Sequence, residues 1–277
     1  GTKLAGQVVA TLVMVLPGYH LIGPGELLGL GHLHLPPLDA VLDVAVTTVF
    51  VVGLVNAFNM LDGLDGLAGG AAAAALAWLA AVAAQSGVTS ALMHMLLLLA
   101  ALLGFLIFNV RHPWRQRASV FMGDAGSMML GAAIAFFMLD LSDGTRGTVP
   151  LPALLWLVAL PTFDTIILIA RRLALGHSPL SGDRRHVHHL LLRAGFSSQT
   201  ATLLLVATCL FYGGIGVASW YFAVPEHLVL IALIAPFAAQ LYLVLHGWRL
   251  IEHVRSVVSG QPPVAADSLP QPGPGFP

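Results

Sequence analysis

Residues 44–66 read VAVTTVFVVGLVNAFNMLDGLDG, an apolar run that ends in a cluster of amides and carboxylates. The run belongs to a mainly apolar stretch, 38–57, whose length matches the roughly 20 residues that a helix needs to cross a bilayer. Ionisable groups at such a boundary are costly unless they face a protein interior or an aqueous cavity. The stretch therefore predicts a membrane helix that presents polar groups to a site at one face of the membrane.

The composition of the whole chain points the same way. Of 277 residues, 57% are hydrophobic and 9% are charged, against about 25% charged in a soluble domain. The 12 Lys+Arg and 13 Asp+Glu give a net charge of −1, which excludes a disordered chain and a basic nucleic-acid-binding protein. The single cysteine, Cys209, excludes a disulfide scaffold and a Cys-rich metal site. An all-α, polytopic membrane protein remains.

We predict a transmembrane helical bundle of about eight spans over residues 1–258, followed by a disordered Pro/Gly-rich cytoplasmic tail at 259–277. The predicted spans are 4–20, 38–57, 67–85, 91–110, 119–140, 149–170, 201–222 and 226–246. If they alternate in direction, every cation except Arg146 falls on one side of the membrane. The excess of positive charge predicts that this side is cytoplasmic.

Three polar segments fall on the same predicted side: residues 56–66, 121–127 and 182–189. The loops on the other side hold no comparable cluster. This distribution favours an enzyme whose site faces cytoplasmic substrates.

The first segment has informative spacing. Asn56, Asn59 and Asp62 are three residues apart, so neighbours share a helix face. Asp65 would point to the opposite side of an unbroken helix, but the glycine after each aspartate allows a break that could turn it back. A polar helix end with an ordinary Asp-Gly turn is the simpler interpretation. Two Asp-Gly pairs and two asparagines at a membrane boundary favour a site instead.

In the second segment, Asp124 stands among small residues near a predicted helix N-terminus. Free N–H groups there favour anions, and small neighbours let a ligand approach the backbone. A simple helix-capping aspartate explains the same pattern equally well.

In the third segment, His186, His188 and His189 follow Arg184 in a predicted loop. A zinc site is a poor fit because no cysteine is near. An anion clamp fits better, since Arg and His donate to phosphate oxygens; the alternative is a solvated basic loop.

The combined set offers oxygen ligands for a hard cation and cationic donors for phosphate. Mg²⁺ is commonly held by one or two carboxylates plus substrate phosphates, and phosphoryl transfer depends mainly on positioning and charge stabilisation. A membrane-embedded site of this kind implies that one substrate is a lipid.

Together the three segments resemble the polyprenyl-phosphate N-acetylhexosamine-1-phosphate transferases, glycosyltransferase family 4, in the branch that uses undecaprenyl phosphate. The similarity extends to residues 186–196 and 224–226 and ends near Ser259. It implies an enzyme that transfers N-acetylhexosamine-1-phosphate, with GlcNAc as the default sugar, from a UDP-sugar to undecaprenyl phosphate. UMP is released, and the reaction begins a cell-envelope polysaccharide such as O-antigen at the bacterial inner membrane.

The resemblance also implies residue roles. Asp124 would be the principal Mg²⁺ ligand, with Asn59 as its partner; Mn²⁺ is the alternative ion. The implied catalytic residues are Asp62, Asp65, His186, His188 and His189, and the implied substrate-binding residues are Asn56, Asn109, Phe121 and Arg184.

One departure concerns an adjacent Asp-Asp pair that the family carries just before the region matching Thr2 to Val9. This sequence contains no such pair. We therefore expect that about three earlier spans are missing, and that this stretch is inactive alone although its parent is an enzyme. Whether the reaction is one-step or covalent, and whether the protein is a homodimer, are left open.

Three alternative classes fit the residues less well. A CDP-alcohol phosphatidyltransferase requires Asp-Gly followed by Ala-Arg and then two further aspartates at four-residue spacing, whereas Asp62-Gly63 is followed by Leu64-Asp65 and no such pair follows. A transporter would place its polar residues near mid-membrane. An intramembrane metalloprotease would require His-Glu-x-x-His.

Overall fold

The computed structural model describes residues 2–19, 39–112, 114–115, 117–142, 149–178 and 186–259. Within these ranges the regular structure is helical, apart from an isolated bridge between His112 and Arg115. The helices are α1 (Thr2–Val15), α3 (Asp39–Leu61), α4 (Leu67–Gln85), α5 (Thr89–Asn109), α6 (Gly123–Ser142), α7 (Leu151–Leu155), η1 (Trp156–Val158), α8 (Ala159–Ala174), α9 (Val187–Arg193), α10 (Ser198–Tyr221), α11 (Glu226–Ala232) and α12 (Ile234–Ser259).

Seven helical segments in the described chain are long and apolar enough to cross a membrane. They are 40–61, 67–85, 89–109, 123–142, 151–174, 198–221 and 226–247. The predicted all-α, multi-pass architecture is thus confirmed for seven of the eight spans. The first predicted span, 4–20, is instead a helix of 14 residues, Thr2–Val15, shorter than the roughly 20 residues of a full crossing. The predicted tail, apart from Ser259 at the end of α12, lies outside the described residues.

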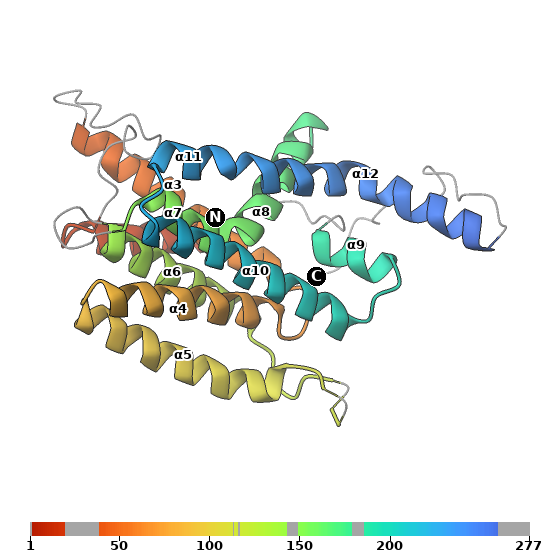
Figure 1. The fold of residues 1–277 in the computed structure, drawn as a ribbon, viewed down its shortest axis with the longest axis horizontal. Helices are drawn as coiled ribbons and strands as arrows, with labels where there is room; N and C mark the ends of the chain where they lie inside the picture. The colour runs from red at the N-terminus through yellow and green to blue at the C-terminus, as the bar shows by residue number, and fades with distance from the viewer. Residues whose placement is uncertain are drawn as a thin grey trace.

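Helix α4 lies between α5 and α10 and also packs against α6 (Figure 1). Its sequence is mostly alanine, and most of its length is buried. Small side chains let neighbouring backbones approach closely, which compensates for the absence of a hydrophobic driving force between helices in lipid. The predicted tight packing of this Ala-rich span is therefore confirmed. Helix α5, by contrast, is largely unburied and forms one edge of the bundle.

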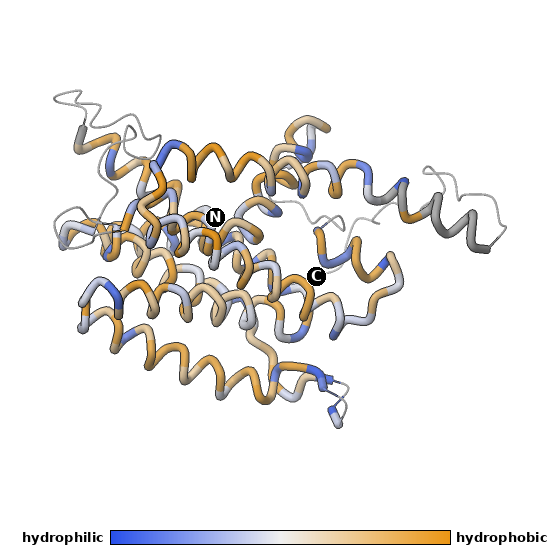
Figure 2. The backbone as a smooth tube through the Cα atoms, viewed as in Figure 1, coloured by the Kyte–Doolittle hydropathy of each residue, from blue (hydrophilic) through white to orange (hydrophobic). Residues whose placement is uncertain are grey.

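Apolar residues run along the spans and hydrophilic ones gather toward their ends (Figure 2). Helix α3 ends at Leu61 and α4 begins at Leu67, so residues 62–66 form the predicted break. Gly66 adopts a φ of 80°, a left-handed conformation that glycine accepts without steric cost. The end of α3, the start of α4 and the start of α6 are thereby brought to the same end of the bundle.

The histidine segment differs from the prediction of a loop. His186 precedes α9, and His188 and His189 lie within this short helix. The backbone carbonyl of His186 accepts hydrogen bonds from the amides of His189 and Leu190. These bonds begin a helix of 7 residues, about two turns, that packs next to α10 and α12.

Candidate active site

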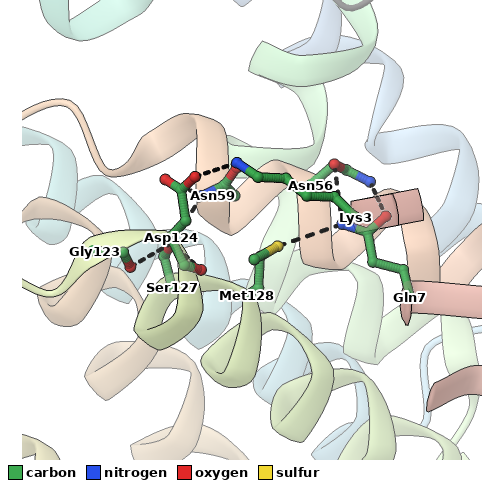
Figure 3. Close-up of polar contacts among 8 residues, drawn as sticks. All are labelled: Lys3, Gln7, Asn56, Asn59, Gly123, Asp124, Ser127 and Met128. Atoms are coloured by element: carbon green, nitrogen blue, oxygen red, sulfur yellow. Dashed lines mark hydrogen bonds and ion pairs between the residues drawn. The ribbon is translucent and has the colours of Figure 1, made fainter. Parts of the chain in front are cut away.

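Asp124 stands at the N-terminus of α6 and is the meeting point of three helices (Figure 3). Its carboxylate forms an ion pair with the ammonium of Lys3 from α1. Its Oδ1 also accepts a hydrogen bond of 3.2 Å from Asn59 Nδ2 of α3. The same Asn59 nitrogen lies 3.1 Å from Ser127 Oγ, one turn along α6. Asp124 remains more than half exposed, so the cluster is open to a ligand.

A second set of contacts holds α1 against α3 beside this cluster. The side-chain amides of Gln7 and Asn56 exchange hydrogen bonds of 3.0 and 3.3 Å. Asn56 Nδ2 also donates to the Val52 carbonyl at 2.7 Å, and Gln7 Nε2 lies 3.6 Å from Met128 Sδ. The predicted substrate-binding Asn56 therefore has protein partners, and its contact with substrate stays a prediction.

Asp62 begins the linker between α3 and α4, where it is half-buried. Burial raises the pKa of Asp62 above its usual value, and the negative charges of Asp124 and Asp65 raise it further. An opposite charge favours the ionised form of a carboxyl group, so a cation placed among these carboxylates would offset the repulsion between them. Asp62 and Asp124 therefore act on each other electrostatically across the break, and their shared role in one site stays a prediction.

Asp65 is directed elsewhere. Its Oδ2 accepts from Arg111 Nε at 2.6 Å and from the Ala118 amide at 3.4 Å, while its backbone carbonyl accepts from Thr202 Oγ1 at 3.2 Å. The break thus ties Asp65 to the segment after α5 and to α10. This structure gives the Asp65 carboxylate an anchoring role, and direct action on substrate stays a prediction.

Asn109, at the end of α5, is buried and joins the two linkers. Its Oδ1 accepts from the Gly66 amide at 2.8 Å, and its Nδ2 donates to the Val120 carbonyl at 2.8 Å. The amide therefore fixes the left-handed turn at Gly66 to the segment that leads into α6. Phe121, in that segment, is mostly exposed. The predicted contact of Asn109 and Phe121 with substrate stays a prediction.

The three histidine rings form a cluster, with the centroids of His186 and His189 6.3 Å apart. His186 and His188 are stacked with centroids 5.3 Å apart, and His188 and His189 are 4.3 Å apart. The ring of His188 lies against the Asp62–Gly66 linker, because a Cβ added to Gly63 would be only 2.4 Å from His188 Nε2. The first and third predicted segments are therefore in contact. Arg184 lies outside the described residues.

His188 differs from the expected cationic clamp. It is almost fully buried, and among the described residues neither of its ring nitrogens has a hydrogen-bond partner. Burial lowers the pKa of His188 to about 3, helped by the neighbouring His189 and His186, so the ring is neutral at pH 7. Charge for an anion must then come from other groups at this end of the bundle.

Asp164, an ionisable group within the 151–174 span, is paired with the first histidine of the third segment. Asp164 Oδ2 lies 2.6 Å from His186 Nδ1, and both side chains are buried. No feature of the sequence near either residue indicated this pairing, apart from the presence of an ionisable group inside a span.

The contact between Gly63 and His188 provides a test of the link between the two segments. Gly63→Ala should displace the His188 ring, because the new methyl group would overlap it, and should lower any sugar-phosphate transfer by about tenfold, the scale of 1–2 kcal/mol of misplacement. The matched control is Gly53→Ala on α3, where an added Cβ meets nothing within 4 Å. Equal activity of the two variants would show that the contact is unimportant.

The donor set fits a hard cation that is shared with a substrate. In the described ranges, no group of three or more His, Cys, Asp and Glu residues could hold a metal alone. Mg²⁺, however, usually keeps several waters and binds one or two carboxylates plus substrate phosphates. Asp124, Asp62 and Asn59 supply oxygens of the required kind, and Asp124 already attracts a cation in the form of Lys3.

The described bundle thus brings carboxylates, an amide and histidines together at one end of its long apolar helices. The family model for glycosyl transferase family 4 matches residues 1–142, just over half of the chain, and the protein belongs to this family.

The curated relatives share one description, undecaprenyl-phosphate alpha-N-acetylglucosaminyl 1-phosphate transferase. The protein from Salmonella typhi is 34% identical over 172 residues, which are 62% of this chain and 47% of the relative. The protein from Escherichia coli K12 is 33% identical over the same length. The protein from Pasteurella multocida is 35% identical over 158 residues, 57% of this chain and 44% of the relative. The chain thus spans about half of the length of the curated relatives it matches.

Proposed function

We propose that the full-length protein transfers N-acetylhexosamine-1-phosphate, with GlcNAc as the sugar, from a UDP-sugar to undecaprenyl phosphate. The observation that carries the proposal is the convergence of Asp124, Asn59 and Lys3 from three helices, with Asp62 close enough for its pKa to respond to Asp124. The names of the relatives supply the substrates. The cluster lies at the ends of long apolar helices, a position that suits a lipid acceptor.

In the proposed reaction, an oxygen of the lipid phosphate attacks the β-phosphorus of the UDP-sugar. The bond between that phosphorus and the bridging oxygen breaks, and UMP leaves with the oxygen. Mg²⁺, held by Asp124 with Asn59 and Asp62, would neutralise charge on the diphosphate. The ammonium of Lys3 is placed beside Asp124, where it can donate to a phosphate oxygen and hold it in position.

We also propose that the cluster faces the cytoplasm of a bacterial cell. The described cations at the same ends of the spans include Lys3, Arg111 and Arg193, and such an excess marks the cytoplasmic side. UDP-sugars are made in that compartment. The same end of the bundle therefore meets a soluble donor from one direction and a lipid acceptor from the other.

The test uses membranes that contain the full-length protein, undecaprenyl phosphate and UDP-GlcNAc labelled in the sugar. We expect label in the lipid extract, UMP released in equal amount, and loss of both when EDTA is added. Parallel assays with UDP-GalNAc and with a CDP-alcohol donor separate the sugar question and the phosphatidyltransferase alternative. Absence of labelled lipid with both UDP-sugars would refute the proposed function.

A further inference from the structure

Asp164 is a buried carboxylate on α8 for which the proposed reaction has no use. It lies in the cytoplasmic half of the 151–174 span, and its side chain is 4% exposed. An ionisable group so placed is costly unless it is paired. Both of its oxygens have partners at the start of α9: Oδ2 lies 2.6 Å from His186 Nδ1, and Oδ1 accepts from the Val187 amide at 3.1 Å.

This geometry determines which nitrogen of His186 is free. The carboxylate is an acceptor, so His186 must carry its proton on Nδ1 to complete the short bond. The ring orientation is then set, and Nε2 is the nitrogen left for other chemistry. The bond to the Val187 amide fixes the first residue of α9 to the same carboxylate.

The dyad is connected to the Asp62–Gly66 linker through one further ring. His186 is stacked on His188 with an interplanar angle of 14°, and His188 Nε2 lies against Gly63. Asp164 on α8 is therefore connected, through His186 and then His188, to the linker at Gly63. A shift of the His186 ring would be passed to the linker through the His188 ring on which it is stacked.

We propose that Asp164 is a positioning residue of the proposed transferase. It holds the Nδ1 proton of His186, presents Nε2 to the diphosphate of the nucleotide sugar, and stabilises the imidazolium that donates to the leaving UMP oxygen. The inference rests on the proposed function for the identity of the reaction. The Asp164–His186 dyad itself is independent of it.

Asp164→Asn provides the sharpest variant because asparagine keeps the volume and can still accept from the Val187 amide. Its amide nitrogen cannot accept the His186 Nδ1 proton, so the ring should change tautomer. We expect kcat to fall about a hundredfold, as on removal of one preorganised donor, with KM changed less than about threefold. Asp164→Glu, which retains the carboxylate, should recover part of the lost kcat.

Two controls separate positioning from stability. Thr165→Val removes the buried neighbouring hydroxyl, which has no hydrogen-bond partner within the part of the chain that the structure describes, and should leave kcat unchanged. In a His186→Gln background, Asp164→Asn should add no further loss, because residues that act as one unit are not additive. If Asp164→Asn alone retains wild-type kcat, or lowers kcat equally with and without His186, the proposal is wrong.

A readout without turnover distinguishes this proposal from the function on which it rests. Nitrogen-15 NMR of the histidine-labelled full-length protein should show His186 protonated at Nδ1 in the wild type and at Nε2 in Asp164→Asn. If the wild type has no transferase activity but the proton still moves from Nδ1 to Nε2 in Asp164→Asn, the proposed reaction is refuted and the dyad is retained. Active protein without the change refutes the positioning role.

Discussion

Asp124→Asn is expected to abolish tight binding of a divalent cation and to lower sugar-phosphate transfer by about a thousandfold. The substitution keeps the size of the side chain but removes the negative charge that now faces Lys3 and Asn59. A bound metal contributes several kcal/mol of charge stabilisation to a phosphoryl transfer, and about 1.4 kcal/mol corresponds to each factor of ten in rate. Loss of the principal carboxylate should remove most of that contribution.

Metal binding can be measured directly, by titrating the purified full-length protein with Mn²⁺ and recording its electron paramagnetic resonance. The matched control is Asp140→Asn, which makes the same chemical change near the other end of α6. Sixteen residues separate the two positions in the sequence, or about 24 Å along the helix axis. An Mn²⁺ affinity that is equal in the two variants would show that Asp124 is not a metal ligand.

Gly216→Ala is expected to be the most destabilising of the small substitutions in the bundle. A Cβ at this position of α10 would lie 2.3 Å from the carbonyl oxygen of Ala153 and 2.7 Å from Cβ of Trp156. A backbone oxygen cannot rotate away, so the two helical segments must separate. Overpacking of this kind costs on the order of 1–3 kcal/mol, and we expect the Tm in detergent to fall by about 5 °C.

Gly104→Ala on α5 is the control. An added Cβ meets nothing within 4 Å there, and alanine is favoured over glycine in a helix by about 1 kcal/mol. Its Tm should be unchanged or higher. A similar Tm for the two variants would contradict the tight approach of α10 to the 151–158 segment.

The spans could be predicted from the sequence because hydrophobic length is a local property. The break at residues 62–66 could be predicted for the same reason, since Asp-Gly pairs act on their own backbone. The helix start near Asp124 could be predicted from the small residues next to it in the sequence. The burial of the span 67–85 could be predicted from its alanine content. The histidine segment was wrongly predicted as a loop, because a short helix depends on the tertiary contacts around it more than on its own propensity.

The partner of each polar side chain could not be predicted from the sequence. Asp62 and Asp65 look alike in the sequence, yet Asp65 bonds to Arg111, 46 residues away, while Asp62 responds to the charge of Asp124. Three histidines within four residues suggested cationic donors for phosphate, but burial makes His188 neutral at pH 7. Desolvation and charge pairing depend on distances across the bundle, which residue spacing along one helix does not contain.

The sequence by itself determined a multi-pass helical bundle with its polar segments at one end, because membrane insertion depends on hydrophobic length and on charge bias. Only the tertiary structure decided that Lys3 meets Asp124 across 121 residues and that Asp164 holds His186 rather than standing alone. The physical reason is that both pairs join helices far apart in the sequence, so that packing decides which charges meet; for the buried Asp164 a partner is also required, because an unpaired buried charge is costly.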